Sequence, residues 1–470
     1  MPQKCEEFVV LTLRVDTIAK IVKGQLTAGS GPECPEGISI NTRTIKKGEI
    51  FIAVPGKRYD GHRFIYQAIE KGASALIVHK RIKKKSCKIP VVTVDNTVAA
   101  LGHLAAYYRR QFQIPIIAVT GSAGKTSTKE LIASVLSQKF NVLKNERSEN
   151  NHFGVPLTLL KLTHKHHVAV LEVGTSQKGD ISCLGQIIKP DMLVFTNIGA
   201  SHLEGLGSIR GVFNEKKSLI KFLTKKGQMI LNLDDMYLKK LVGQAPSVSK
   251  MTYAVQQKAD FQAKNLNFDN NNRIQFKVNR ELFTLPTPAY HQVYNALAAI
   301  AVGRHFGLTL SDINKGLKTS LHCSGRQKIQ SIGGVTIIDD TYNSNPLSFR
   351  SSINSLNTIH AKGKKILVGG DMLELGELSE KWHRQIGKDI LHSSIDVFIG
   401  FGRNARFIYD ECCRDGDKVL AKSFVYLHYL HRFLAKIIQP GDIVLIKGSR
   451  GMHLERTVNF LEENLSQSRK

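Results

Sequence analysis

The 470-residue sequence predicts an α/β protein with three domains, and three observations support this prediction. At about 150 residues per domain, the length accommodates about three domains. Short β-branched segments alternate with helical patterns along most of the chain, which is typical of mainly parallel sheets covered by helices. A glycine-rich loop joins one of these segments to a helix, and loops of this kind bind phosphate groups.

The first 97 residues are expected to form a small α/β domain. Its strand patterns lie at 50–54, 75–78 and 91–94, and its helical pattern lies at 64–73. Polar residues at 95–97 offer capping side chains for a helix that ends in Arg109 and Arg110. We therefore place the first domain boundary near residue 97.

Residues 98–319 and 320–470 are expected to form two larger α/β domains. The central one has strand patterns at 116–120, 168–172, 192–196 and 229–231, a helix at 129–140 and a β-hairpin over 266–278. The last one has strand patterns at 335–338, 366–368, 397–400 and 443–446. The intervals between these strands are long enough for crossover helices, which predicts parallel pairing.

The composition excludes several classes of protein. Hydrophobic residues make up 42 % and charged residues 22 %, which are ordinary values for a globular chain and exclude a disordered or fibrous one. The seven cysteines are scattered without a C-x-x-C pair, which indicates reduced thiols. We find neither a secretory signal nor a run of about 18 apolar residues, so we expect a cytoplasmic protein without membrane insertion.

The balance of charges is unusual, because 66 Lys and Arg against 39 Asp and Glu leave a formal net charge of +27. Nucleic acid, an anionic membrane or phosphorylated small molecules would each explain such a surplus. The most concentrated basic run, residues 79–88, contains no Phe, Tyr or Trp that could stack on bases. The charge alone does not choose among these partners.

The strongest local signal is IIAVTGSAGKTST, residues 116–128. Gly121 and Gly124 allow backbone N–H groups to approach phosphate oxygens, and the start of the following helix adds a partial positive charge. Lys125 can reach the outer phosphates of a nucleotide, and the Thr126 hydroxyl can bind Mg²⁺. The cofactor-binding residues expected from this loop are Gly121, Ser122, Ala123, Gly124, Lys125, Thr126 and Ser127.

The match to the generic phosphate-loop pattern is incomplete, because Val119 stands where that pattern has glycine. A tight turn with a surface lysine would also explain the segment. The strand pattern before the loop and the helical pattern after it favour the nucleotide site.

Two residues beyond the loop, Glu172 and His202, are candidate ligands that also have ordinary explanations, and a third, Lys216, is by default a solvated surface lysine. Glu172 closes a strand pattern and would face the phosphate loop, where it could hold Mg²⁺; a carboxylate bound by a helix cap is the alternative. His202 lies in a glycine-flanked loop after a strand, but a lone histidine is more often packed or solvated. Lys216 carries no independent signal among 66 basic residues.

Polar groups also gather in the last third of the chain. His291 and Asn295 would share one face of a helix, although a polar cap over a core helix explains them equally well. Arg326 follows a glycine and suits phosphate binding, whereas a linker arginine is the commoner case. The segment DDTYNSNP at 339–346 follows a strand pattern and could equally form a plain turn.

The order of the motifs is more specific than any one of them. They appear as TGSAGKTSTKE, ENNHFGVPLTLLKL, LEVGTSQKGDI, NIGASHLEGLGS, YNALAA, SGR, DDTYNSNP, GDMLELGELS and IKGSRG. Together with ISINTRTIKKGEIFIAVPGKRYDGHRF at 38–64, this series closely resembles the Mur ligases of peptidoglycan synthesis over nearly the whole chain. The resemblance implies a nucleotide-sugar-binding first domain, a central phosphate-loop ATPase domain and a Rossmann-like third domain that helps to bind ATP and the incoming amine.

The resemblance also implies roles for single residues. Lys125 is similar to the family's phosphate-loop lysine and Thr126 to its magnesium-binding hydroxyl, while Glu172 and His202 match further metal ligands. Lys216 matches a lysine that CO₂ carbamylates, and the resulting carboxylate helps to hold a second Mg²⁺. The expected catalytic residues are therefore Lys125, Glu172, His202 and Lys216.

Further implied contacts concern ATP and the substrate. His291 and Asn295 match the adenine side of the ATP site, Arg326 resembles an arginine that reaches ATP phosphate, and Asp340 resembles an acid near the ribose. The expected substrate-binding residues are Thr42, Arg43, Asn150, Asn151, Tyr342 and Asn343.

The implied reaction forms an amide bond in two stages. A terminal carboxylate of a UDP-N-acetylmuramoyl-tripeptide attacks the γ-phosphate of ATP and gives an acyl phosphate and ADP. The amine of D-alanyl-D-alanine then attacks the activated carbonyl and expels phosphate. We expect a monomer that binds ATP and Mg²⁺ but no nucleic acid.

Five positions depart from the family pattern: Asn41, His152, Ser176, Gln177 and Gln292. They lie outside the phosphate loop and the implied metal ligands, so they affect fine substrate contacts.

Three alternatives remain at the level of sequence. The Mur ligase that adds the third amino acid should carry an Asp-Asn-Pro-Arg signature, which is absent. A relative of folylpolyglutamate synthase should lack the nucleotide-sugar domain. A basic nucleic-acid-binding ATPase, from a different class, should carry a helicase-like acidic box or a basic face rich in aromatic residues, and neither pattern is found.

Overall fold

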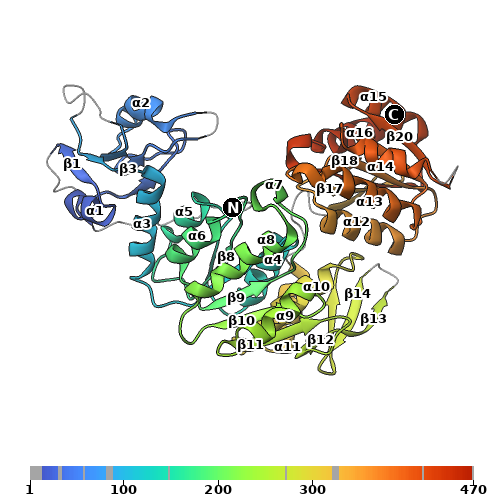
Figure 1. The fold of residues 1–470 in the computed structure, drawn as a ribbon, viewed down its shortest axis with the longest axis horizontal. Helices are drawn as coiled ribbons and strands as arrows, with labels where there is room; N and C mark the ends of the chain where they lie inside the picture. The colour runs from blue at the N-terminus through green and yellow to red at the C-terminus, as the bar shows by residue number, and fades with distance from the viewer. Residues whose placement is uncertain are drawn as a thin grey trace.

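The computed structural model describes residues 13–29, 34–56, 59–80, 88–146, 149–269, 273–319, 328–414 and 418–467. Figure 1 shows an elongated molecule in which a small unit and a larger C-terminal unit lie at opposite ends, with a central unit between them. The basic run at 81–87 and Arg326 lie outside the described residues.

The first unit is a five-stranded sheet of order β1-β5-β4-β3-β2, in which only β1 is antiparallel to its neighbour. Its elements are α1 (Val15–Ile21), β1 (Gln25–Ala28), β2 (Gly37–Ser39), β3 (Glu49–Ile52), α2 (Ile65–Glu70), β4 (Ala75–Val78) and β5 (Val91–Thr93). The apolar runs of β3 and β4 are fully buried, so both faces of these strands contact core residues, as the sequence pattern predicts.

Helix α3 (Thr97–Arg109) joins the first unit to the central one (Figure 1). The Asn96 side chain accepts hydrogen bonds from the backbone N–H groups of Val98 and Ala99 and caps this helix. The capping prediction is therefore confirmed.

The central unit contains a seven-stranded sheet of order β12-β11-β10-β9-β6-β8-β7, parallel throughout its described pairs. Its strands are β6 (Ile116–Thr120), β7 (Val142–Lys144), β8 (Val168–Glu172), β9 (Met192–Phe195), β10 (Gln228–Asn232), β11 (Ser249–Ala254) and β12 (Phe261–Gln262). The next two strands in the chain, β7 and β8, lie on one side of β6, and the later strands β9 to β12 lie on its other side. The crevice outside the carboxyl end of β6 is thus a topological switch point, where open α/β sheets bind ligands.

Helices cover both faces of this sheet. They are α4 (Lys125–Leu136), α5 (Gly154–Leu159), α6 (Asp180–Ile188), α7 (Leu203–Leu206), α8 (Ile209–Lys217), α9 (Met236–Gln244), α10 (Gln292–His305) and α11 (Leu310–Thr319). The prediction that the first of them begins at residue 129 is wrong. Gly124 has φ +78, and this left-handed turn leads directly into α4 at Lys125.

The expected hairpin is part of a three-stranded antiparallel sheet of order β13-β14-β15. Its strands are β13 (Lys264–Phe268), β14 (Ile274–Val278) and β15 (Glu281–Leu285). The third strand was not predicted. Phe276 and Phe283 stack across β14 and β15 with ring centroids 5.9 Å apart, and this pair is buried in the central core.

The C-terminal unit is a six-stranded sheet of order β16-β17-β21-β18-β19-β20, with only β16 antiparallel. Its strands are β16 (Lys328–Ile332), β17 (Val335–Asp340), β18 (Lys365–Gly370), β19 (Val397–Phe401), β20 (Leu420–Phe424) and β21 (Ile443–Lys447). Its α-helices are α12 (Pro346–Thr358), α13 (Ser379–Leu391), α14 (Ala405–Cys412), α15 (Leu427–Ile437) and α16 (Glu455–Gln467). The edge strands β16 and β20 were not predicted, because their sequences are partly polar.

Candidate active site

A cavity of about 440 Å³ lies at the carboxyl ends of the central strands, against the loop that follows β17. It brings together residues from the central and C-terminal units. Those expected from the sequence are Ser122, Ala123, Gly124, Lys125, Thr126, Ser127, Asn150, Asn151, Glu172, His202, His291, Asp340, Tyr342 and Asn343.

Two glycines of the phosphate loop are required by close contacts. A Cβ on Gly121 would lie 1.9 Å from the Thr196 Oγ1. A Cβ on Gly124 would lie 2.8 Å from the Asn295 Oδ1, and its φ of +78 is unfavourable for residues with side chains. The Lys125 Nζ donates a hydrogen bond to the Gly121 carbonyl at 2.9 Å, which holds this ammonium group over the loop.

Glu172 lies directly beside the phosphate loop. One carboxylate oxygen accepts a hydrogen bond from the Thr126 hydroxyl, and the other accepts one from the Asn150 Nδ2 at 2.7 Å. The Asn145 Oδ1 accepts from the Glu172 N–H at 2.8 Å and fixes the end of β8. The side chain of Asn151 instead accepts from backbone N–H groups at the start of α5, so of this asparagine pair only Asn150 contacts Glu172.

Lys216, on α8, is only 1 % exposed. Its Nζ has no hydrogen-bond partner in the described part of the chain. Burial lowers the pKa of this ammonium group well below its usual range and the charge of Lys125 lowers it further, while Glu215 and Glu172 act in the opposite direction. The site therefore contains a buried amine that interacts electrostatically with Lys125 and Glu172.

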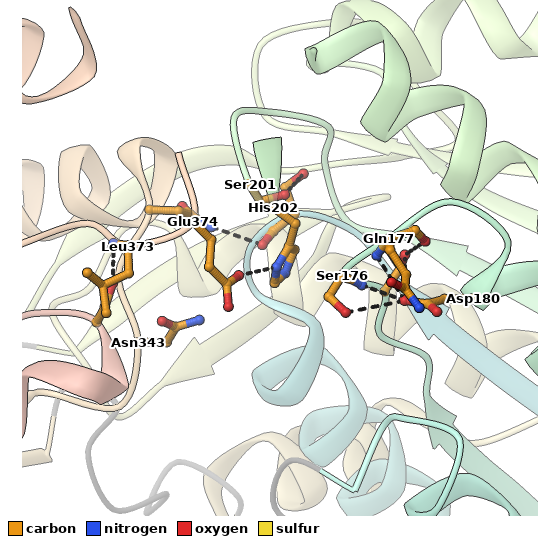
Figure 2. Close-up of polar contacts among 12 residues, drawn as sticks. Ser176, Gln177, Asp180, Ser201, His202, Asn343, Leu373 and Glu374 are labelled. Carbon is orange, nitrogen blue, oxygen red and sulfur yellow. Dashed lines mark hydrogen bonds and ion pairs between the residues drawn. The ribbon is translucent and has the colours of Figure 1, made fainter. Parts of the chain in front are cut away.

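His202 follows β9 and lines the cavity, but its Nδ1 lies 2.5 Å from Oε2 of Glu374 in the C-terminal unit. Figure 2 shows these two side chains pointing toward each other across the boundary between the units. No group of three or more His, Cys, Asp or Glu that could hold a metal occurs among the residues that the structure describes. A metal site formed by Glu172 and His202 would need a further ligand.

His291 and Asn295 mark the start of α10, as expected. The buried Nδ1 of His291 has no hydrogen-bond partner among the described residues. Burial lowers the pKa of His291 to about 4, with Asp340 opposing and Lys447 adding to the effect. Asn295 does not line the cavity. Its Oδ1 accepts a hydrogen bond at 3.0 Å from the hydroxyl of Thr128, which lies in the first turn of α4 just after the phosphate loop.

The C-terminal unit contributes a buried ion pair. The Lys447 Nζ lies 2.8 Å from Oδ2 of Asp340 and also donates to the Asn343 carbonyl at 3.1 Å. The Ser352 hydroxyl donates to the same Asp340 oxygen at 2.6 Å. Asp340 is thus held in place among the residues that line the cavity.

Two expected substrate residues lie in the first unit and do not line the cavity. The Thr42 hydroxyl donates to Oε1 of Gln67 at 2.6 Å, and Arg43 is exposed.

Sequence reasoning missed a role for Asp180. Its Oδ2 accepts hydrogen bonds from the backbone N–H groups of Ser176 at 2.8 Å and Gln177 at 3.0 Å (Figure 2). Its Oδ1 lies 2.9 Å from the His152 Nε2. Asp180 therefore fixes the backbone of a segment that lines the cavity. The signal available in the sequence was an acid shortly after a Ser-Gln pair at a helix start.

The fold and the site define the class of the protein as an α/β protein with a nucleotide-type phosphate loop facing a second α/β unit. Three family models match the chain: "Mur ligase family, catalytic domain" over 36–109, "Mur ligase middle domain" over 119–303 and "Mur ligase, glutamate ligase domain" over 325–450. The chain belongs to the Mur ligase family.

Individual relatives extend over nearly the full length. The chain is 35 % identical to the UDP-N-acetylmuramoyl-tripeptide–D-alanyl-D-alanine ligase of Bacillus subtilis, over 96 % of this chain and 98 % of the relative. It is 32 % identical to the ligase of the same name from Escherichia coli, over 97 % and 99 %.

Solved structures agree with this likeness. A crystal structure of MurF from Acinetobacter baumannii superposes with a TM-score of 0.87 at 30 % identity, covering 95 % of this chain and 98 % of that one. MurF ligase from Thermotoga maritima in complex with ADP gives a TM-score of 0.80 at 29 % identity, covering 92 % and 98 %. Within the described residues, none of the helices is both long and apolar enough to span a membrane.

Proposed function

We propose that this protein is an ATP-dependent ligase that joins D-alanyl-D-alanine to a UDP-N-acetylmuramoyl-tripeptide in cytoplasmic peptidoglycan precursor synthesis, acting as a monomer. The observation that carries the proposal is the full-length likeness to ligases of that name, at 35 % identity over 96 % of the chain. The cavity supports it, because it joins a phosphate loop to polar groups of a second unit.

The proposal assigns one task to each domain. Residues 1–97 bind the UDP-linked substrate, residues 98–319 bind ATP, and residues 320–470 help to bind ATP and the dipeptide. The separate five-, seven- and six-stranded sheets and the three family-model matches support this division. Thr42 and Arg43 then contact the uridine diphosphate, which explains why they lie away from the cavity.

ATP lies along the phosphate loop in this proposal. The loop N–H groups and Lys125 bind the phosphates, and His291 and Asn295 form the adenine side. Arg326 and Asp340 approach from the third domain, at a phosphate and at the ribose. The ADP complex of the Thermotoga maritima relative supports a nucleotide in this family's site.

The side chains near Glu172 fit Mg²⁺. Glu172 and the Thr126 hydroxyl supply hard oxygen ligands that already contact each other. His202 and a carbamylated Lys216 complete the proposed set. When bound, Mg²⁺ neutralises negative charge on the phosphates and on the attacking carboxylate.

Lys216 supports the carbamylation hypothesis because its buried Nζ lacks a partner and its pKa is lowered. A neutral amine can attack CO₂, forming an N–C bond and losing one proton. The product is a carboxylate on a side chain whose charge interacts with that of Glu172. The charge of Lys125 nearby would stabilise it.

The reaction proceeds in two transfers. The substrate carboxylate oxygen attacks the γ-phosphorus, the bond to the bridging oxygen breaks, and ADP leaves. The dipeptide amine then attacks the acyl carbon, loses a proton, and phosphate leaves. In this proposal Lys125 offsets the repulsion between the two anions, and Asn150, Asn151, Tyr342 and Asn343 orient the substrate.

A phosphate-release assay with purified protein, ATP, Mg²⁺, UDP-N-acetylmuramoyl-tripeptide and D-alanyl-D-alanine tests the proposal. We expect steady release only with all components present. Release that ignores omission of the dipeptide would contradict the ligase reaction. Release that requires DNA or RNA would instead support the nucleic-acid-dependent ATPase.

A further inference from the structure

Glu374 connects the C-terminal unit to the loop that carries His202. Its carboxylate lies 2.5 Å from the His202 Nδ1, and its backbone oxygen accepts a hydrogen bond from the Glu204 N–H at 3.2 Å (Figure 2). Glu374 lies between β18 and the 3₁₀ helix η4 (Gly376–Leu378), whereas His202 follows β9. Two bonds from one residue therefore join segments 172 positions apart in the chain.

The backbone on both sides of this contact is unusual. His202 has φ 51 and Glu374 has φ 64, a left-handed region that residues with side chains rarely adopt. Gly376, with φ +55, packs against the backbone of Glu204. Residues held in this conformation are concentrated at functional sites. The two turns direct the Glu374 carboxylate and the His202 ring toward each other.

The contact assigns different roles to the two ring nitrogens of His202. An ionised carboxylate only accepts hydrogen bonds, so the proton between the two groups belongs to Nδ1. The Nε2 makes no hydrogen bond in the described part of the chain and stays available on a side chain that lines the cavity. Metal-binding histidines commonly hold the second nitrogen against a carboxylate, which fixes the ring and raises its basicity.

We propose that Glu374 is a positioning residue for a divalent metal bound by His202, and that it makes metal binding depend on docking of the C-terminal unit. This inference rests on the metal role of His202 in the proposed function. Glu172 and Lys216 belong to the central unit, so only the third unit supplies the acid that orients the histidine. Because the coupling is reciprocal, bound metal in turn favours docking.

Binding of Mn²⁺ to the full chain, followed by electron paramagnetic resonance with a non-hydrolysable ATP analogue, tests this without turnover. Glu374→Gln keeps the size of the side chain but removes its charge. We expect its Mn²⁺ affinity to fall by about tenfold or more. Glu374→Asp should recover part of the affinity. Glu377→Gln changes an exposed acid on η4 without a described ion pair and should bind as the wild type does.

A kinetic readout separates positioning from a loss of structure. The Mg²⁺ concentration needed for half-maximal phosphate release should rise in Glu374→Gln, while kcat at saturating Mg²⁺ is retained. Unchanged Mn²⁺ affinity in Glu374→Gln, with a lost site in His202→Ala, would overturn this inference alone. If His202→Ala also binds Mn²⁺ normally, the metal role of His202 in the proposed function fails as well.

Discussion

Lys216 shows how burial changes the chemistry of a single side chain. In water a lysine is a solvated cation, and only the family resemblance, not any local pattern, singles out Lys216 among the 66 basic residues. In the fold its Nζ is enclosed beside Lys125, which favours the neutral amine. The neutral form is the one that can react with CO₂.

We expect Lys216→Ala to lower the rate of ligation by about a hundredfold or more, because a charge-stabilising group is lost. Formate or acetate in the assay should restore part of the rate by occupying the place of the carbamate. Lys217→Ala is the matched control, since the Lys217 Nζ lies on the surface and donates to Gln244 at 2.7 Å. Full activity of Lys216→Ala without added acid would refute the role of Lys216.

The lowered pKa of His291 predicts that part of the protein's folding stability is lost in acid. Its folded-state pKa of about 4 lies below the usual 6.5, so between these values the unfolded chain binds a proton that the folded protein excludes. Stability is therefore lost as the pH falls from 6.5 toward 4, by about 2 kcal/mol at pH 5. Asp340 and Lys447, which form an ion pair with each other, are the charged groups that act on the His291 ring.

Urea unfolding at pH 7 and pH 5 measures this effect. In His291→Gln the difference in unfolding free energy between the two pH values should shrink by about that amount. The same change at the exposed His428 should leave the difference as in the wild type. An equal acid sensitivity in His291→Gln and the wild type would contradict the prediction.

Among the elements, α12 is notable because the residue that caps its N-terminus, Asn345, also contacts the phosphate loop. The Asn345 Oδ1 accepts from the Ser348 N–H at 2.9 Å, and the Ser348 hydroxyl accepts in return from the Asn345 N–H, which forms a capping box. The Asn345 Nδ2 donates to the Ser122 carbonyl at 3.1 Å. One side chain thus starts a helix and contacts the loop of another unit.

Two substitutions separate these functions of Asn345. Asn345→Ala should cost about 1 kcal/mol of stability and raise KM for ATP, because it loses both the cap and the contact with Ser122. Asn345→Ser should keep the cap and still raise KM for ATP. Thermal unfolding and steady-state kinetics measure the two effects. If Asn345→Ser has the KM of the wild type, the contact with the loop has no role in ATP binding.

The elements also show where sequence patterns are sufficient. The buried strands β4, β6 and β8 end within a residue of their predicted limits, because a continuous apolar run has no other stable environment. Edge strands such as β16 and β20 pair on one side and are half exposed, so their patterns are weak. The start of α4 was misplaced because Gly124 and the polar turn at its end look like loop in sequence.

At the scale of the whole molecule, the central and C-terminal units meet in close packing next to the cavity. Gly199, in the loop after β9, lies against Leu347 at the start of α12, and a Cβ there would be 2.2 Å from the Leu347 Cδ1. The packing of these two units therefore depends on the absence of a side chain at Gly199.

Gly199→Ala should separate the two units without unfolding either of them. We expect kcat/KM to fall by about tenfold, since misplacement by about 1 Å of groups that align reactants costs up to about a hundredfold. Small-angle X-ray scattering should show a larger radius of gyration. Gly243→Ala, with open space around its Cβ, is the control and should leave both values unchanged. Unchanged kinetics in Gly199→Ala would show that this contact does not set the docked arrangement.

The sequence by itself determined the α/β class, the phosphate loop and the order of motifs that marks the family, because apolar periodicity and local turn chemistry are written in neighbouring residues. Tertiary structure alone decided which side chains contact one another in the site and how deeply each is buried. The burial of Lys216, the pairing of Asp340 with Lys447 and the contact of His202 with Glu374 join residues that are far apart in the chain. Charge, solvation and metal affinity depend on neighbours in space, and only the packing of the units supplies those neighbours.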